Sequence, residues 1–233
     1  MICFIDYRTT QKEKDTLSSL NLKVIEIPKS NDVYSAIDGH VDIQLNILDK
    51  KTKKIIINRN MDKNFKESLS KLNIKFIESE KFLESSYPNN IYLNALILDD
   101  YFIHNLKFTD KNLLSFQKDK TLINVKQGYT KCSCLPISKN ALITNDAGIY
   151  KILSKFNLDI LLLPPGDIIL EGLDYGFIGG TGGLINDDTI AFFGNLDYYK
   201  YGKEVKDFLK KHNVTPIYLN NMKLHDRGSL LVL

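Results

Sequence analysis

The feature that most constrains this chain is a repeated turn that ends in asparagine. Four times, an amphipathic stretch with helical spacing ends in asparagine and leads directly into an apolar segment typical of a strand. The four asparagines are Asn21, Asn73, Asn157 and Asn213. Asparagine tolerates the left-handed conformation in which many helices end, so each one indicates a turn from helix into strand. We therefore predict a repeated helix–strand unit.

The spacing of these turns predicts five units. The interval between Asn73 and Asn157 is wide enough for two units, and a weaker copy of the pattern lies within it, over residues 113–125. Five units in 233 residues average about 47 residues, a length typical of propeller and solenoid repeats. Hairpin-like strand pairs are also predicted at 41–48 with 55–57, 91–98 with 101–103, 129–137 with 141–144, and 177–185 with 189–193.

The two end segments indicate how the units close. Residues 2–7 read as a strand without a preceding helix, and residues 228–233 read as a unit that is begun but not finished. If the first strand completes the last unit, the repeat forms a ring and leaves no strand edge exposed. An open solenoid would need capping units, which the pattern does not show. We expect one α/β domain over residues 1–233, an α/β propeller with five-fold pseudo-symmetry.

Polar residues recur in the predicted inner strands. Residues 40–47 alternate strictly, so His40, Asp42, Gln44 and Asn46 are expected on one strand face. By the same rule Cys132 and Cys134 share one face and Lys131 and Ser133 the other. Equivalent positions around a ring converge on its axis, so we expect one polar cluster. The other units would add these residues: Asn94, Lys131 to Cys134, Gly179 to Gly183, and His225 to Ser229.

These residues also have simpler interpretations. His40 and Asp42 could lie on an exposed strand face, and the two cysteines could be core residues. The glycine run is followed by a strand pattern rather than a helix, which excludes a phosphate loop and favours close strand packing. The cysteines lack zinc-knuckle spacing, so we expect no metal. Two further histidines, His104 and His212, read as surface positions.

The whole pattern resembles the pentein superfamily, which includes arginine deiminases, agmatine deiminases, dimethylarginine dimethylaminohydrolases and glycine amidinotransferases. The resemblance covers the chain as architecture, and the segments 40–44, 128–133 and 176–180 are closest to an uncharacterised bacterial branch. It implies a hydrolase or amidinotransferase-like enzyme acting on a guanidino or amidino compound. In such enzymes a cysteine thiolate attacks a guanidinium carbon, carboxylates hold the cation, and histidine relays protons.

Carried onto this chain, the resemblance implies a catalytic cysteine at Cys132 or Cys134 and an acid/base at His40 or His225. Asp42 and Asp226 would bind the cation. The remaining ligand-binding candidates along the axis are Gln44, Asn94, Lys131 and Gly180. A catalytic thiolate near histidine is expected to have a lowered pKa.

One departure matters, because the known enzymes place their cysteine in the final unit and no cysteine follows Cys134 here. This departure keeps open a catalytically degenerate pentein that acts as a small-molecule-binding or interaction protein. Chemistry based on Lys131, Ser133 or Ser229 is a third alternative.

The composition limits the kinds of partner that this chain is expected to bind. Lys and Arg number 31 against 28 Asp and Glu, a formal net charge of +3 that gives no reason to expect nucleic acid or an anionic membrane as partner. Three cysteines without a disulfide framework and an N-terminus without a signal-type segment favour a cytoplasmic protein. We expect a small-molecule ligand and no cofactor.

Overall fold

The computed structural model describes residues 1–233 and contains five three-stranded sheets with one common plan. In each sheet the central strand pairs antiparallel with one neighbour and parallel with the other. A helix connects the two parallel strands. The sheet orders are β15-β1-β2, β3-β4-β5, β6-β7-β8, β11-β10-β9 and β12-β13-β14. The chain therefore has a mixed α/β fold built from small sheets, and these sheets do not join into a continuous barrel.

The strands are short and the helices lie between them in sequence. The strands are β1 (Ile2–Asp6), β2 (Lys23–Ile27), β3 (Leu45–Asp49), β4 (Lys54–Ile57), β5 (Lys75–Glu78), β6 (Leu96–Ile97), β7 (Tyr101–His104), β8 (Thr121–Asn124), β9 (Cys134–Ser138), β10 (Ala141–Thr144), β11 (Asp159–Leu162), β12 (Gly182–Leu184), β13 (Thr189–Phe192), β14 (Thr215–Tyr218) and β15 (Leu231–Val232). The helices are α1 (Gln11–Ser19), α2 (Val41–Gln44), α3 (Lys63–Lys71), α4 (Lys111–Ser115), α5 (Thr130–Ser133), α6 (Ala147–Leu153) and α7 (Gly202–Lys211), with 3-10 turns η1 (Ile178–Thr181) and η2 (Leu196–Tyr198).

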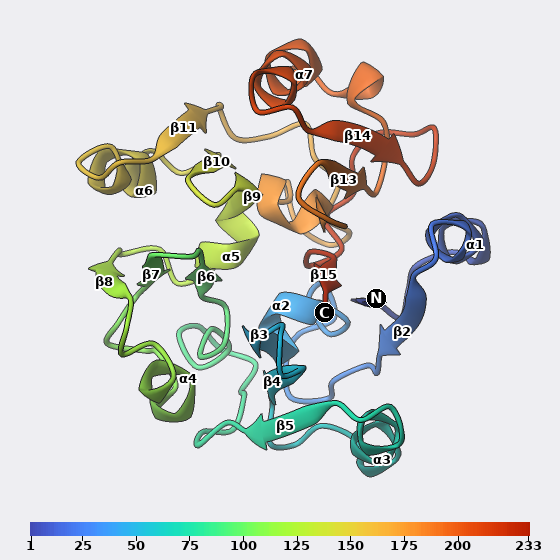
Figure 1. Cartoon of the computed structure of the whole chain (residues 1–233), viewed down its shortest axis with the longest axis vertical. Coiled ribbons are helices and arrows are strands. Elements are labelled where there is room, and N and C mark those ends of the chain that lie inside the picture. Colours follow the sequence, from blue (N-terminus) through green and yellow to red (C-terminus); the bar gives the residue numbers. More distant parts are fainter.

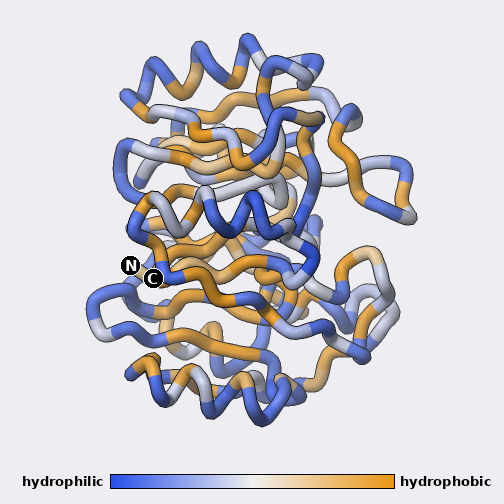
Figure 2. Tube along the Cα trace, turned by 90° about the vertical axis from the view of Figure 1, so that its right-hand side faces the viewer, coloured by the Kyte–Doolittle hydropathy of each residue, from blue (hydrophilic) through white to orange (hydrophobic).

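The first and last strands share one sheet. Strand β1 pairs antiparallel with β15, with Cys3 opposite Val232 and Phe4 opposite Leu231, and pairs parallel with β2 on its other side. The expected completion of the last unit by the first strand is confirmed. Figures 1 and 2 show the two ends of the chain side by side as a result.

Local signals explain most helix boundaries. Thr10 and Glu13 form the capping box that begins α1, and Asp62, Asp110 and Asp146 cap α3, α4 and α6. Asparagines 21, 73 and 213 have φ of 60°, 56° and 56°, as their role at helix ends requires. Asn157 is an exception: it does not adopt this conformation, because α6 already ends at Leu153.

Neighbouring sheets pack through separate apolar clusters. Each cluster between successive sheets contains residues from both sheets. The pairs are Phe4 with Ile55, Ile56 with Phe102, Ile103 with Leu142, and Ile143 with Phe192. A further cluster, with Ile5 and Phe193, joins the last sheet to the first. Burial of this apolar surface is the main stabilising contribution to such a fold. Figure 1 shows the sheets around a common centre with the long helices outside, and Figure 2 shows hydrophobic strands between helices of mixed hydropathy. No helix has the length and apolar character needed to span a bilayer.

The predicted inner strands are partly wrong. Residues 41–44, 130–133 and 178–181 each form a single helical turn, α2, α5 and η1, and the strand begins only after it. Residues 91–95 likewise precede the short β6. All four residues of α2 are buried, so the alternation of polar and apolar residues here does not correspond to one solvent-exposed face and one buried face. The predicted sharing of strand faces, by His40 with Asn46 and by Cys132 with Cys134, is therefore wrong.

Candidate functional site

Asp42 lies at the centre of a buried polar cluster. It stands on α2, just before β3, and is fully buried. The Cys132 thiol on α5 donates to its Oδ1 at 3.1 Å, and the Ser229 hydroxyl donates to its Oδ2 at 2.5 Å. These three side chains come from different units of the chain, so the short helical turns bring together residues that are far apart in sequence.

Asn94 links the turns that carry Asp42 and Cys132. Its Nδ2 donates to the Asp42 carbonyl at 3.1 Å and lies 3.2 Å from the Cys132 sulfur. Its Oδ1 accepts from the backbone N–H groups of Lys131 and Cys132, at 2.9 and 3.2 Å. A fully buried amide with several partners fixes the relative position of two segments. Asn94 therefore holds the thiol against the carboxylate.

Lys131 supplies the buried positive charge. Its ammonium donates to Ser229 Oγ at 2.8 Å and to the Gly179 carbonyl at 3.4 Å. Ser229 thus connects the lysine to Asp42, and its φ of 71° is uncommon for a residue with a side chain. The sequence named Ser229 only as one alternative for the chemistry, and its contacts with Asp42 and Lys131 are visible only in the tertiary structure.

His40 and Asp226 form the other side of the cluster. Asp226 accepts from the backbone N–H groups of Phe177 and Gly228, at 2.8 and 3.0 Å. His40 Nε2 lies 3.9 Å from Asp226 Oδ1, beyond hydrogen-bond distance. Both ring nitrogens of His40 are buried without a hydrogen-bond partner. One histidine nitrogen, one Asp42 oxygen and the Cys132 sulfur lie within 4.8 Å of one another.

Glycines give this side of the cluster its space. A Cβ on Gly180 would collide with the carboxylate of Asp226. Gly228, at a φ of 65°, would place a Cβ against the His40 side chain. Close approach, rather than phosphate binding, accounts for Gly180.

Burial and like charge shift the protonation equilibria of the cluster. Burial raises the pKa of the Cys132 thiol well above its usual value, and the carboxylates of Asp42 and Asp226 raise it further. Burial also raises the pKa of Asp226 and lowers the pKa of Lys131. The expectation of a lowered cysteine pKa is wrong, because burial and the two nearby carboxylates both oppose the thiolate.

Several sequence candidates lie outside the cluster. Gln44 is buried but donates to the carbonyls of Pro28 and Asp38. His225 contacts the Lys223 carbonyl through Nδ1, and the Cys134 thiol lies 3.7 Å from Thr144 Oγ1. Burial raises the pKa of Cys134 to about 12. The structure therefore separates Cys132 and His40 from the alternatives Cys134 and His225.

Neither of the two histidines expected at the surface is exposed. His104 is fully buried, so that expectation is wrong: its Nδ1 lies 2.8 Å from Thr109 Oγ1 and its Nε2 lies 3.1 Å from the Gly128 carbonyl. His212 is largely covered too, and its Nε2 lies 2.7 Å from Asp159.

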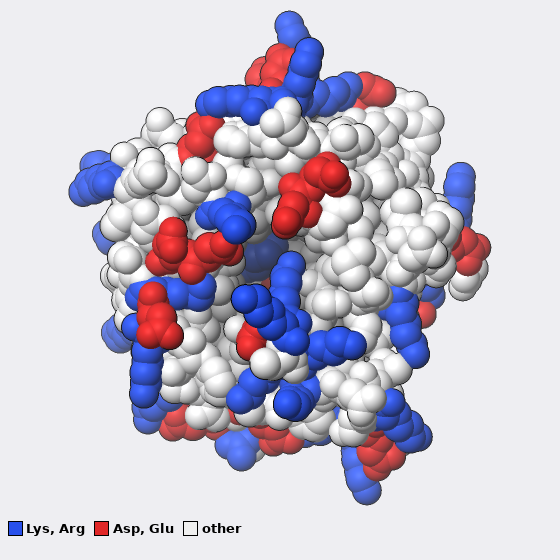
Figure 3. All heavy atoms as spheres, in the orientation of Figure 1, with Lys and Arg blue, Asp and Glu red and all other residues white.

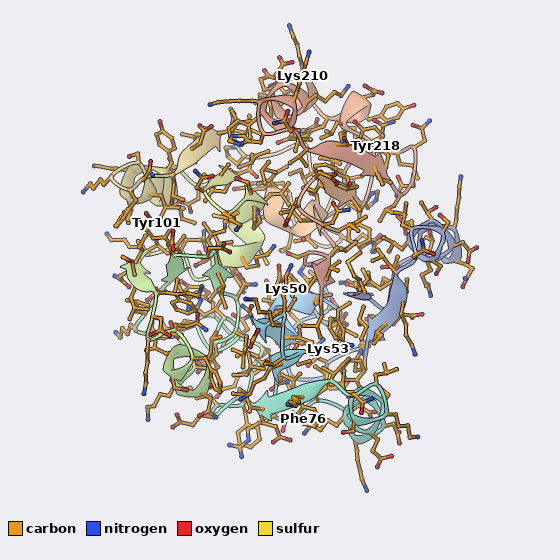
Figure 4. All side chains as sticks on the ribbon, in the orientation of Figure 1. Lys50, Lys53, Phe76, Tyr101, Lys210 and Tyr218 are labelled. Carbon is orange, nitrogen blue, oxygen red and sulfur yellow. The ribbon has the colours of Figure 1, made fainter.

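A cavity of about 970 Å³ opens toward the lysine side of the cluster. It is lined by residues of β3, β6, β9, β12 and β15, one inner strand from each sheet, and Lys131 also lines it. Figure 3 shows a central hollow with basic side chains beside it, and in Figure 4 Lys50 lies near the centre while Phe76 and Tyr218 lie further out. A ligand in this cavity would meet the Lys131 side chain before Asp42.

The far side of the cluster includes tyrosines that sequence reasoning missed. The hydroxyls of Tyr34 and Tyr129 lie 3.4 Å apart, and Tyr129 donates to Asn90 Oδ1 at 3.0 Å. The rings of Tyr129 and Phe177 are 6.5 Å apart. These residues lie in loops and helix caps without a periodic pattern, so no sequence signal places them together.

The model of a protein family described as a family of unknown function, DUF6873, matches residues 4–231. The chain belongs to the DUF6873 family. No curated protein matches this DUF6873 chain in sequence.

Solved structures show that this DUF6873 member has a pentein-like fold, as the sequence indicated. An amidinotransferase of the Microseira wollei saxitoxin pathway superposes with a TM-score of 0.56 and 10% identity, covering 93% of this chain and 75% of that one. A C. jejuni agmatine deiminase gives a TM-score of 0.50 and 13% identity, covering 94% and 75%. A DDAH from Pseudomonas aeruginosa complexed with citrulline gives 0.52 and 9%, covering 97% and 92%. These structural neighbours are enzymes that modify guanidino groups, and at such low identity the likeness concerns the fold.

Proposed function

We propose that residues 1–233 form a single five-fold pseudo-symmetric α/β propeller that acts on a guanidino or amidino compound. Support for the propeller comes from the common plan of the five sheets and from the apolar clusters between successive sheets. Support for the activity comes from the structural neighbours and, above all, from one contact. The Cys132 thiol donates to a buried carboxylate while an unpartnered histidine lies beside both.

In this proposal Asp42 and Asp226 bind the cationic group. Two buried carboxylates with only one buried ammonium nearby form an environment that favours a further positive charge. A guanidinium between them would offset the two charges that disfavour the thiolate, so the substrate itself would ease ionisation of Cys132. The site would therefore be inert until the cation is bound.

The reaction would proceed by covalent catalysis. The Cys132 thiol gives its proton to His40 as the sulfur bonds to the guanidino carbon, and Asp42 stays ionised to hold the cation. His40 passes this proton to the leaving amine as the carbon–nitrogen bond breaks. Water, or a second amine in a transferase, then gives a proton to His40 and bonds to the same carbon, and this proton returns to the sulfur as the carbon–sulfur bond breaks. Asn94 and Lys131 act as positioning residues, through the backbone of α5 and through Ser229.

The experiment compares two alkylating agents on the folded chain. 2-Chloroacetamidine carries the amidinium charge, whereas iodoacetamide is neutral, and mass spectrometry locates the adduct. We expect chloroacetamidine to label Cys132 at least tenfold faster than iodoacetamide does, with Cys3 and Cys134 as internal controls. Asp42→Asn should remove this preference. Equally slow labelling by both agents would contradict the covalent proposal.

The complete burial of Asp42 and the raised thiol pKa favour a second candidate, a pentein that binds such a ligand without chemistry. A thermal-shift series with small guanidino compounds separates the two. Stabilisation lost in Asp42→Ala but kept in Cys132→Ala, without turnover of the compound, would indicate binding alone.

A further inference from the structure

We propose that His40, Asp42 and Cys132 bind a divalent transition-metal ion of the zinc type. The inference goes beyond the proposed function and does not depend on it. It starts from the donor set, which offers one nitrogen, one oxygen and one sulfur within 4.8 Å of one another. Imidazole and thiolate together favour zinc, cobalt or copper over magnesium and calcium, which prefer oxygen ligands.

The distances are close to those of a coordination sphere. Ligand bonds of about 2.0 to 2.3 Å in a tetrahedral zinc site place the ligand atoms about 3.4 Å apart. The Cys132 sulfur and Asp42 Oδ1 are already 3.1 Å apart. The widest separation in the set is no more than 4.8 Å, so side-chain rotations that move the donor atoms by about 1 Å would complete the geometry.

His40 provides the independent sign of a ligand. Its side chain is 1% exposed, and neither ring nitrogen has a hydrogen-bond partner. A buried polar group left without a partner destabilises the folded state, so native proteins seldom retain one. A metal ion would satisfy the nitrogen that faces Asp42 and Cys132.

The residues around the donor set resemble the outer shell of metal sites. Asp226 Oδ1 lies 3.9 Å from His40 Nε2, so a shift of about 1 Å would bring it to the hydrogen-bond distance at which a carboxylate orients a metal-binding histidine. Asn94 Nδ2 donates to the Cys132 sulfur and to the Asp42 backbone carbonyl, and the Ser229 hydroxyl donates to the second carboxylate oxygen of Asp42. Three protein ligands would leave a fourth position open, as in zinc sites that bind water or substrate.

The charges also balance. Asp42, Asp226 and a Cys132 thiolate together carry three negative charges, and Lys131 carries one positive charge. A divalent ion would bring the sum to zero in a buried region. The ion replaces the thiol proton, which leaves to solvent, so binding requires no oxidant or reductant.

Cobalt titration of the full chain tests the proposal. We expect one Co²⁺ per chain and a near-ultraviolet sulfur-to-cobalt charge-transfer band that Zn²⁺ abolishes by displacement. Cys132→Ser should remove the band, and His40→Gln and Asp42→Asn should weaken binding at least tenfold. Cys134→Ser and His225→Gln, which change the same residue types outside the cluster, should leave binding unchanged.

X-ray absorption of the wild-type zinc complex should show one sulfur ligand, which keeps the test valid if a variant fails to fold. Absence of saturable binding, or a band that survives in Cys132→Ser, would overturn the proposal. A cobalt–sulfur band with slow chloroacetamidine labelling would reject the covalent enzyme and retain the metal site. Fast labelling of Cys132 without the cobalt–sulfur band would reject the metal site and retain the covalent enzyme.

Discussion

The thiol of Cys132 donates a hydrogen bond to the carboxylate of Asp42 at 3.1 Å, although 90 residues separate the two in the chain. This contact joins the first and third units of the repeat in the interior of the molecule. A thiol beside a carboxylate is a poor nucleophile at rest, because the negative charge opposes formation of the thiolate. Both the covalent proposal and the metal proposal require a positive charge to enter the cluster.

Asp42 and Lys131 are expected to be energetically coupled through Ser229. Asp42→Asn removes from the buried Lys131 ammonium the carboxylate that Ser229 links to it, and Lys131→Met leaves the Asp42 carboxylate without the ammonium. Each single variant should lower the free energy of unfolding by about 3 kcal/mol. The double variant should lose clearly less than the sum of the singles, as measured by urea denaturation. Simple additivity would show that the charges do not interact.

His104 should make stability depend on pH. Burial lowers its pKa from 6.5 to about 4, so between these values the unfolded chain binds more protons than the folded one. The contribution of neutral His104 to the free energy of unfolding is fully present above pH 6.5. It decreases as the pH falls toward 4, by about 3 kcal/mol in total. Denaturant unfolding at several pH values checks this. His104→Gln should have a flatter profile over this range, and a parallel profile would exclude His104 as the cause.

The pairing of β1 with β15 can be tested with a disulfide. Ile2 and Leu233 exchange two backbone hydrogen bonds, so the next pair, Cys3 opposite Val232, is a non-hydrogen-bonded pair. Such a pair places its Cα atoms about 4.5 Å apart. Val232→Cys should therefore form a disulfide with Cys3 on oxidation and raise the free energy of unfolding by about 2 to 4 kcal/mol. The same substitution in a Cys3→Ser background is the control. A thiol that stays free at position 232 after oxidation would contradict the pairing.

Gly228 should tolerate alanine less well than Gly172. Both have positive φ, of 65° and 87°, so alanine strains the backbone by about 1 to 2 kcal/mol at either position. Only at Gly228 would the new Cβ also collide with His40, whereas nothing lies within 4 Å at Gly172. Thermal unfolding should show a clearly larger loss for Gly228→Ala. Equal losses would indicate that His40 can move aside freely.

The repeat, the helix caps and most helix ends could be predicted from the amino-acid sequence alone. These features depend on neighbouring residues: a capping box needs only Thr10 and Glu13, and a left-handed turn needs only an asparagine such as Asn73. The meeting of Asp42 with Cys132 was also predictable in outline, because equivalent positions of a repeat lie near a common centre.

The form and chemistry of the cluster could not be predicted in this way, because they arise from contacts between units. Residues 41–44 form a helical turn that other units bury on every side, which removes the difference between faces that sequence periodicity records. The raised thiol pKa, the unpartnered His40 and the role of Ser229 depend on distances between units. Such distances are set by packing between sheets, and no local pattern encodes them.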